Sequence, residues 1–317
     1  MENIVYIEIN SELGAGTRGA SLGVEALRVA SWNAGSTLLN KYPVEKVPNR
    51  NELLWEPNPT PNGIHIAGIL EVYRNMARAT THAIKNEKFP VVLAGDHSTA
   101  GATIAGIKKA KPDARIGVVW VDAHGDMHTP YTTPSGNVHG MPLATALNYD
   151  NQENAINEVS EEEQGIWEEM KNLGGIAPKI EFEDLVFVGV RDIEEPEEKL
   201  MNTHQIRNYT VAEVNAKGAK AIGEQVLAQL EGCDHIYISF DVDSMDADLV
   251  SEGTGTPVKD GLSAEQAGEL LETLVQSPKL IAFEMVEINP CLDNKRNKMA
   301  ETALEQLSRV IKVLEEK

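Results

Sequence analysis

The sequence predicts an α/β fold in which helices flank a parallel β-sheet and residues 1–317 form a single domain. Short apolar runs alternate with amphipathic stretches from one end of the chain to the other, which is the pattern of successive βα units. The clearest run, Ile116–Val121, contains only apolar or small residues, as a strand buried on both faces requires. No linker or shift in composition marks a domain boundary.

The first half of the chain begins with a strand, a turn and a helix. Asn3–Asn10 alternates like a strand, and a glycine-rich turn, Gly14–Gly23, leads into a helix that begins near Val24. Its glycines match no phosphate-binding motif, so we do not expect a phosphate site there. The next elements are a loop with one short strand at 41–61, a long amphipathic helix at 63–88, strands at 89–94 and 116–121, and a helix of small residues at 99–109.

The second half continues the alternation of strands and helices. An acidic, mainly helical stretch occupies 150–180. A strand at 184–190, one long helix at 211–230, a strand at 235–240, a helix at 263–276, a strand at 280–286 and an amphipathic helix at 297–317 follow it.

The charge and cysteine content restrict the partners and the compartment. A formal net charge of −21 argues against nucleic acid and anionic membranes as partners, because binding to them depends on Lys and Arg. Only two cysteines occur, far apart, and no apolar run approaches the roughly 20 residues that span a bilayer. We therefore expect a cytoplasmic protein without disulfides.

Polar side chains follow nearly every predicted strand at the point where it ends. They are His97; Asp122, His124 and Asp126; Glu194; Asp241 and Asp243; and Glu287. Alternate residues on an extended backbone share a face, and the carboxyl ends of parallel strands meet at one edge of the sheet. We expect the strands before His97 and Asp122 to be neighbours in the sheet, and all of these side chains to form one site.

Two imidazoles and four aspartates from this set would suit a binuclear metal centre. The four carboxylates balance the charge of two divalent cations, and ligation rich in oxygen favours Mn²⁺ over a structural zinc ion. Two such ions would bridge a water, lower its pKa and support hydrolysis at neutral pH. The sequence therefore predicts metal-assisted hydrolysis.

Six segments together resemble the motifs of the arginase, or ureohydrolase, family. They are Gly95–Ser98, Asp122–Asp126, Ser135–Gly140, Ser239–Asp243 with Asp246, Gly253–Val258, and Glu287–Pro290, and they occur in the order of the family. The resemblance implies a three-layer α/β/α sandwich with a mostly parallel sheet of about eight strands. It also implies two Mn²⁺ per chain, hydrolysis of a small guanidino substrate to urea, and a homo-oligomer, either a trimer or a hexamer.

The resemblance assigns a role to each metal ligand. His97 and Asp126 would bind one manganese, His124 and Asp243 the other, and Asp122 and Asp241 would bridge both. It also makes His139, Asp126 and Glu287 the catalytic residues. His139 resembles a histidine that transfers protons, and Glu287 resembles the carboxylate that pairs with the substrate guanidinium. Thr256 would line the same pocket.

The substrate pocket resembles the arginase branch of the family, with two departures. Ser135 and Asn137 would bind the α-carboxylate of L-arginine, and Glu194 and Glu197 would face its α-ammonium group. His128 stands where an asparagine is expected and Glu194 where an aspartate is usual. We expect L-arginine to give L-ornithine and urea, with His128 donating to the carboxylate through a ring nitrogen.

Three alternatives remain open. The chain could be another ureohydrolase, namely an agmatinase, a guanidino-acid hydrolase or a formiminoglutamase. A deacetylase of related fold would need only one metal ion. A non-catalytic metal-binding assembly protein would be expected to have lost ligands, yet all six are present.

Overall fold

A parallel sheet of eight strands forms the middle layer of the computed structural model, which describes residues 3–317; the first two residues of the predicted domain lie outside this range. The strand order is β2-β1-β3-β8-β7-β4-β5-β6, and every pair is parallel. The strands are β1 (Ile4–Ile9), β2 (Val44–Lys46), β3 (Phe89–Ala94), β4 (Ile116–Val121), β5 (Leu185–Val188), β6 (Arg207–Tyr209), β7 (His235–Asp241) and β8 (Leu280–Val286).

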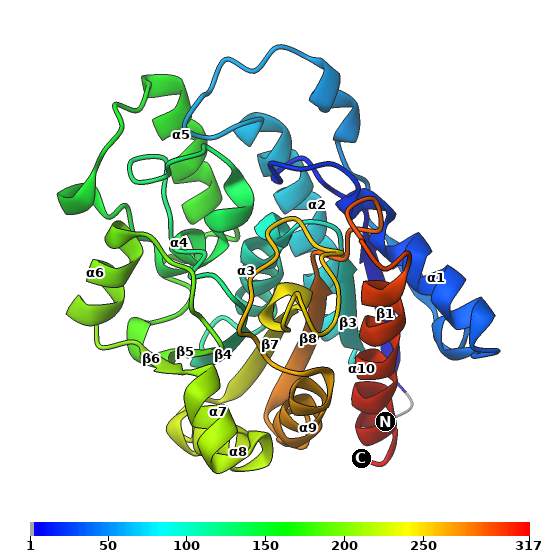
Figure 1. Cartoon of the computed structure of the whole chain (residues 1–317). Helices are drawn as coiled ribbons and strands as arrows, with labels where there is room; N and C mark the ends of the chain where they lie inside the picture. Colours follow the sequence, from blue (N-terminus) through cyan, green and yellow to red (C-terminus); the bar gives the residue numbers. More distant parts are fainter. Residues whose placement is uncertain (1–2) are drawn as a thin grey trace.

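Helices cover both faces of the sheet, so the predicted three-layer α/β/α sandwich is confirmed (Figure 1). One layer contains α1 (Gly23–Asn33), α7 (Val211–Lys217), α8 (Ala219–Gln229), α9 (Ala264–Leu274) and α10 (Lys298–Glu315). The other contains α2 (Ile66–Lys85), α3 (Ala100–Ala110), α4 (Pro142–Leu147), α5 (Glu161–Lys171) and α6 (Glu195–Thr203). Successive strand residues pack into opposite layers, as the twofold period of a strand requires.

The expectation that β3 and β4 are neighbours was wrong. The last two long strands of the chain, β8 and β7, insert between them. Because all strands are parallel, their carboxyl ends still meet at one edge of the sheet, so the polar residues converge there.

Two predicted helical stretches differ in the structure. The helix expected at 211–230 is divided into α7 and α8 by Gly218, whose φ of 88° suits glycine and interrupts a helix. The acidic stretch at 150–180 contains only α5 and a short 3₁₀ turn at Gln152–Asn154. Three short elements, α4, α6 and β6, were not predicted; each has nine residues or fewer.

Candidate functional site

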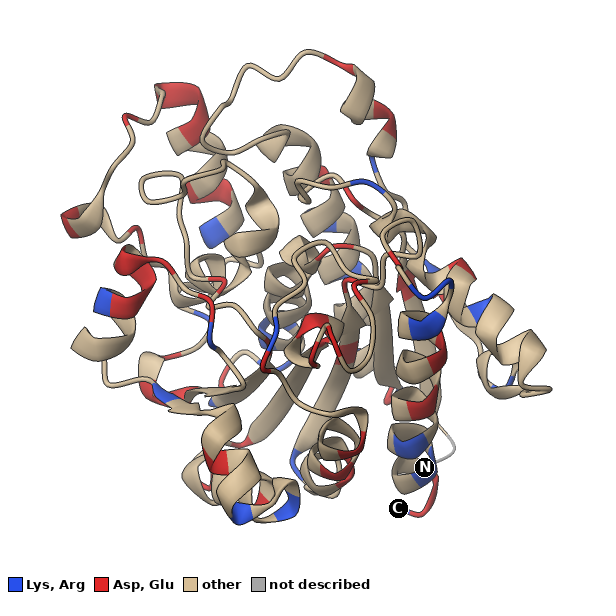
Figure 2. Ribbon diagram, viewed as in Figure 1, with Lys and Arg blue, Asp and Glu red and all other residues tan. Residues whose placement is uncertain are grey.

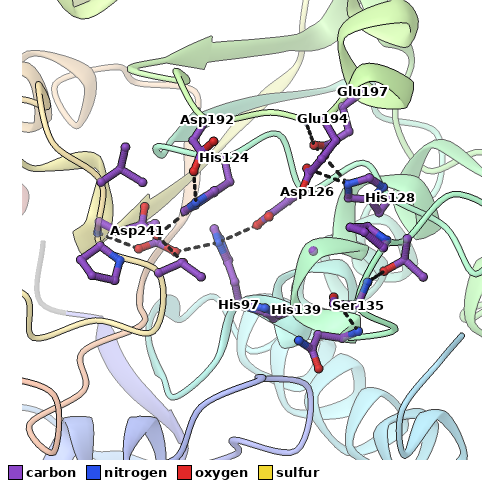
Figure 3. Close-up of a pocket in the computed structure, with 18 residues that line it drawn as sticks. His97, His124, Asp126, His128, Ser135, His139, Asp192, Glu194, Glu197 and Asp241 are labelled. Carbon is purple, nitrogen blue, oxygen red and sulfur yellow. Dashed lines mark hydrogen bonds and ion pairs between the residues drawn. The ribbon is translucent and has the colours of Figure 1, made fainter. Parts of the chain in front are cut away.

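The predicted ligand residues lie together at the carboxyl edge of the sheet, and Figure 3 shows four of them, His97, His124, Asp126 and Asp241. His97 begins the turn after β3, Asp122 follows β4 directly, and Asp241 is the last residue of β7. All three are almost completely buried. Four neighbouring strands, β3, β8, β7 and β4, thus supply the floor of one site.

His97 is surrounded by carboxylates on one side of its ring. Its Nδ1 lies 3.1 Å from Asp122 Oδ2, 3.0 Å from Asp126 Oδ2 and 3.1 Å from Asp241 Oδ2. The other ring nitrogen, Nε2, lies 2.8 Å from Ser239 Oγ, and the ring stacks on Trp120 with a centroid distance of 4.2 Å. Nδ1 is therefore the nitrogen that faces the cluster.

His124 forms a second group that shares Asp122 with the first. His124 Nδ1 lies 3.1 Å from Asp243 Oδ2 and 3.5 Å from Asp122 Oδ1. The sets His97–Asp122–Asp126 and Asp122–His124–Asp243 each place their ligand atoms within 4.8 Å of one another. One carboxylate common to two groups is the arrangement of a bridging ligand.

The backbone holds the acids in these orientations. Asp122 accepts a hydrogen bond from the backbone of His124 at 2.7 Å, and Asp241 accepts one from Asp243 at 2.8 Å. Asp126 adopts a left-handed backbone conformation with φ 51°, which is uncommon for a residue with a side chain. Such strain is typical of residues that a site holds in place.

The chemistry of this cluster fits metal cations. The buried atoms His97 Nδ1 and Asp122 Oδ2 have no hydrogen-bond partner, which is costly unless another group satisfies them. Burial, together with the charges of Asp243 and Asp122, raises the pKa of Asp241. Divalent cations would satisfy the free ligand atoms and relieve the repulsion among the carboxylates.

His139 and Glu287 lie beside this cluster. His139 Nδ1 is 3.2 Å from Glu287 Oε1, and the same oxygen accepts the backbone N–H of His97 at 2.8 Å. Burial lowers the pKa of His139, but the hydrogen bond and charge of Glu287 outweigh it and raise this pKa to about 9. Glu287 has a φ of 67°, and its buried Oε2 has no partner. One buried carboxylate oxygen is thus left without a partner.

The outer end of the site is built around His128. Its Nε2 lies 2.9 Å from Glu194 Oε2 and 3.4 Å from Glu197 Oε2, and its Nδ1 lies 3.2 Å from Thr132 Oγ1. Both ring nitrogens therefore contact protein groups. Burial raises the pKa of Glu197 to about 7, whereas the hydrogen bond from His128 lowers the pKa of Glu194 to about 2.

A cavity of about 420 Å³ joins the two ends of the site. Ser135, Asn137 and Thr256 line it as expected, and Thr256 Oγ1 donates to Asp243 Oδ2 at 3.1 Å. Asp122 and Glu287 lie behind the surface of the cavity. The lining also contains six residues to which the sequence analysis gave no role: Thr133, Pro134, Gly140, Asp192, Pro257 and Val258.

Asp192 has the clearest sequence signal of the missed residues, because it follows β5 just as the metal-site acids follow their strands. Its Oδ2 lies 3.8 Å from His124 Nε2, although its side chain is 68% exposed.

The glycine-rich turn packs against the site. The backbone N–H of His139 donates to the Gly14 carbonyl at 3.1 Å, and the backbone N–H of Gly14 donates to Asp96 Oδ2 at 3.0 Å. A Cβ atom on Gly16 would lie 2.5 Å from Asn137 Nδ2. A side chain at Gly16 would displace the Asn137 amide, so the turn approaches the site closely at this glycine.

Comparison with known proteins gives one consistent result. Residues 2–311 match the sequence profile described as the Arginase family. The chain is 34% identical over 313 residues to an arginase of Bacillus subtilis (strain 168), covering 96% of each chain. Its fold resembles the native arginase structure of Bacillus caldovelox with a TM-score of 0.83, 32% identity and 98% of each chain covered. An Entamoeba histolytica arginase structure in complex with L-ornithine gives a TM-score of 0.81 at 26% identity, covering 98% of this chain and 99% of that one.

Proposed function

The chain belongs to the arginase family of hydrolases, which act on guanidino C–N bonds, and from this premise we propose that it hydrolyses L-arginine to L-ornithine and urea at a binuclear manganese centre. The observation that carries the proposal is the pair of ligand groups that share Asp122. Two ions lower the pKa of a water that they bind and so supply a nucleophile at neutral pH.

We assign the ligands as the sequence predicts. His97 and Asp126 bind one ion, His124 and Asp243 bind the other, and Asp122 and Asp241 bridge them. The position of Nδ1 of both histidines among the carboxylates supports this assignment. Imidazole with several carboxylates per ion suits Mn²⁺.

Glu287 and His139 act on the substrate. The Glu287 carboxylate pairs with the guanidinium, and its free Oε2 offers the acceptor that a planar cation requires. The hydrogen bond to Glu287 raises the pKa of His139, which suits it to donate a proton to the departing amino group. His139 Nδ1 and Glu287 Oε1 are 3.2 Å apart, so one guanidinium group can contact both residues.

The outer residues select the other end of the substrate. Ser135 and Asn137 offer donors to an α-carboxylate, and Glu194 and Glu197 offer negative charge to an α-ammonium group. The sequence suggested that His128 donates to the carboxylate, but both of its ring nitrogens contact protein groups, so we propose that His128 acts on the substrate by orienting Glu194. The relative solved with L-ornithine supports an amino-acid product.

We also propose a cytoplasmic homo-oligomer, a trimer or hexamer, made of one domain per chain that spans residues 1–317. Cys233 and Cys291 are free thiols, which suits a reducing compartment. Within residues 3–317, no helix combines the length and apolar character needed to cross a membrane. Figure 2 shows Asp and Glu spread over α5, α6 and the surface loops, which disfavours nucleic acid as a partner.

The test is urea release from arginine, agmatine, guanidinobutyrate and guanidinopropionate, and ammonia or formamide release from formiminoglutamate, with Mn²⁺ supplied. We expect arginine to give the highest kcat/KM, because a pocket whose donors are left unpaired rejects agmatine. Comparable values for arginine and agmatine would contradict the substrate assignment and leave the family membership unaffected. A single bound metal ion per chain would contradict the binuclear centre.

A further inference from the structure

A row of buried polar side chains, here called the polar ladder, continues from the candidate metal ligands into the middle of the sheet. Tyr237, Ser239 and Asp241 alternate along β7 and therefore share one face, which packs against α3. Glu284 of β8 is paired in register with Ser239. None of these four side chains is appreciably exposed.

Hydrogen bonds connect the ladder to a predicted metal ligand. His97 Nε2 lies 2.8 Å from Ser239 Oγ, and the Tyr237 hydroxyl donates to Glu284 Oε2 at 2.6 Å. Burial and the neighbouring Glu284 raise the pKa of Tyr237. Tyr237 lies two residues before Ser239 on the same face of β7, and Glu284 is the register partner of Ser239, so the three side chains adjoin one another.

Glu284 is an unusual residue for its position. It is the single charged residue of β8, its exposure is 0%, and it forms no ion pair within residues 3–317. Strand interiors of parallel sheets are normally apolar, and burying a carboxyl group is costly. An apolar residue would fill this space at lower cost, so the carboxyl group has a use beyond packing.

Metal binding through Nδ1 would determine which nitrogen of His97 carries the proton. Nδ1 faces three carboxylates at 3.0–3.1 Å, so it must be unprotonated to bind a cation. Nε2 then carries the hydrogen and donates it to Ser239 Oγ. The partners of that second nitrogen determine ring orientation and ligand basicity.

We propose that Tyr237 and Glu284 are positioning residues for the His97 metal ligand and act through Ser239. His97 Nε2 contacts Ser239 Oγ, and Ser239 is flanked on the same face of the sheet by Tyr237 and Glu284, which are hydrogen-bonded to each other. This arrangement holds His97 in the tautomer and orientation that aim Nδ1 at the cluster. This inference rests on the proposed binuclear centre.

The test is calorimetric titration of the full metal-free chain with Mn²⁺. Tyr237→Phe and Glu284→Gln should each weaken the binding of one of the two ions by roughly tenfold or more, the usual range for residues behind a metal ligand. Tyr6→Phe is the matched control. Tyr6 is equally buried in β1 of the same sheet, and its hydroxyl donates to the Leu38 carbonyl away from the cluster.

A second measurement separates positioning from general packing. In a Ser239→Ala background, where the connection to His97 is already broken, Tyr237→Phe should cause no further loss of Mn²⁺ affinity. The inference is wrong if Tyr237→Phe and Glu284→Gln bind Mn²⁺ as tightly as Tyr6→Phe, or if the loss persists undiminished in the Ser239→Ala background. A wild-type chain that binds no Mn²⁺ would overturn the proposed function together with this inference.

Discussion

The inner and outer ends of the cavity are built in different ways. At the inner end, His97, Asp122 and Asp241 lie at or just after strand ends and are almost fully buried, and each carboxylate lies 3.1 Å from His97 Nδ1. At the outer end, His128 and Glu194 come from a loop and from the start of α6, and the Glu194 side chain is 55% exposed. The sheet therefore fixes the positions of the inner side chains, whereas loops fix the positions of the outer ones.

We expect this difference to separate the residues that act in the chemical step from the residues that select the substrate. Strand ends are positioned by a whole layer of backbone hydrogen bonds, so ligands placed there keep their geometry when surrounding loops change. The outer residues depend on a few side-chain contacts, and the departures from the family pattern, His128 and Glu194, both occur there. Substitutions should therefore affect metal binding and turnover at the inner end and substrate affinity at the outer end.

The largest effect is expected at the bridging carboxylates. Asp122→Ala or Asp241→Ala should abolish urea release and bring bound Mn²⁺ below two per chain, because each bridge serves both ions. Metal content by elemental analysis and urea release would be measured together. Asp113→Ala, which removes an exposed carboxylate, is the control and should behave as wild type. Full activity after exhaustive metal removal would contradict the binuclear assignment.

The second prediction tests whether His139, at the inner end, transfers protons without binding metal. His139→Ala should lower kcat by roughly 10²- to 10⁴-fold while both ions remain bound, because proton transfer by a positioned side chain contributes about that much. Steady-state kinetics and metal analysis provide the measurement. His82→Ala, on the exposed side of α2, is a matched control. Loss of metal in His139→Ala would make His139 a ligand instead.

The third prediction tests the buried acid of the outer end. Burial raises the pKa of Glu197 from 4.5 to about 7, so between these values the folded chain holds a proton that the unfolded chain has lost. The folded state is therefore destabilised as pH rises through this window. Relative to wild type, Glu197→Gln should gain stability between pH 5 and pH 8, by about 1–3 kcal/mol.

Urea unfolding of the metal-free proteins at the two pH values would measure this gain. Glu198→Gln, on the same helix but exposed, is the control. Equal pH dependence in wild type and Glu197→Gln would show that Glu197 ionises normally in the folded chain.

The smallest effect is expected for His128→Asn. Its contacts are with Glu194 and Glu197 at the outer end, so it should change KM for arginine by roughly tenfold or less and leave kcat nearly unaltered, as expected for binding that is uniform between ground and transition states. Kinetics with arginine and agmatine would measure both. A fall in kcat equal to the fall in kcat/KM would place His128 in the chemical step and remove the distinction between the two ends.

The sequence predicts the inner end better than the outer end for a physical reason. Apolar runs identify strands, and the residues that follow parallel strands must share an edge, so the convergence of His97, Asp122 and Asp241 could be expected without knowing the strand order. The order itself could not, because pairing of β8 with β3 joins segments separated by about 190 residues and has no local signal. The wrong pairing of β3 with β4 arose from this.

Local sequence patterns also fail to predict features that depend on tertiary contacts. The apolar period continues across Gly218, so the break between α7 and α8 was not predicted although the glycine itself was the signal. The contact of His128 with Glu194 and Glu197 depends on where α6 begins, and that nine-residue helix was missed. The sequence analysis gave no role to buried Glu284, because it lies within the apolar run that predicted β8. Its charge is the one irregular feature of that run.

The position of β8 has a consequence for how this chain folds during synthesis. β8 is the last strand to leave the ribosome, yet it occupies the gap between β3 and β7. Until residue 286 has been made, the sheet exists as two parts with unpaired inner edges, and such edges pair readily with other chains. His97 lies on one part and Asp122 and Asp241 lie on the other, so metal cannot be captured by the full ligand set before that strand inserts. Premature termination before β8 should therefore yield aggregating fragments rather than weakened enzymes.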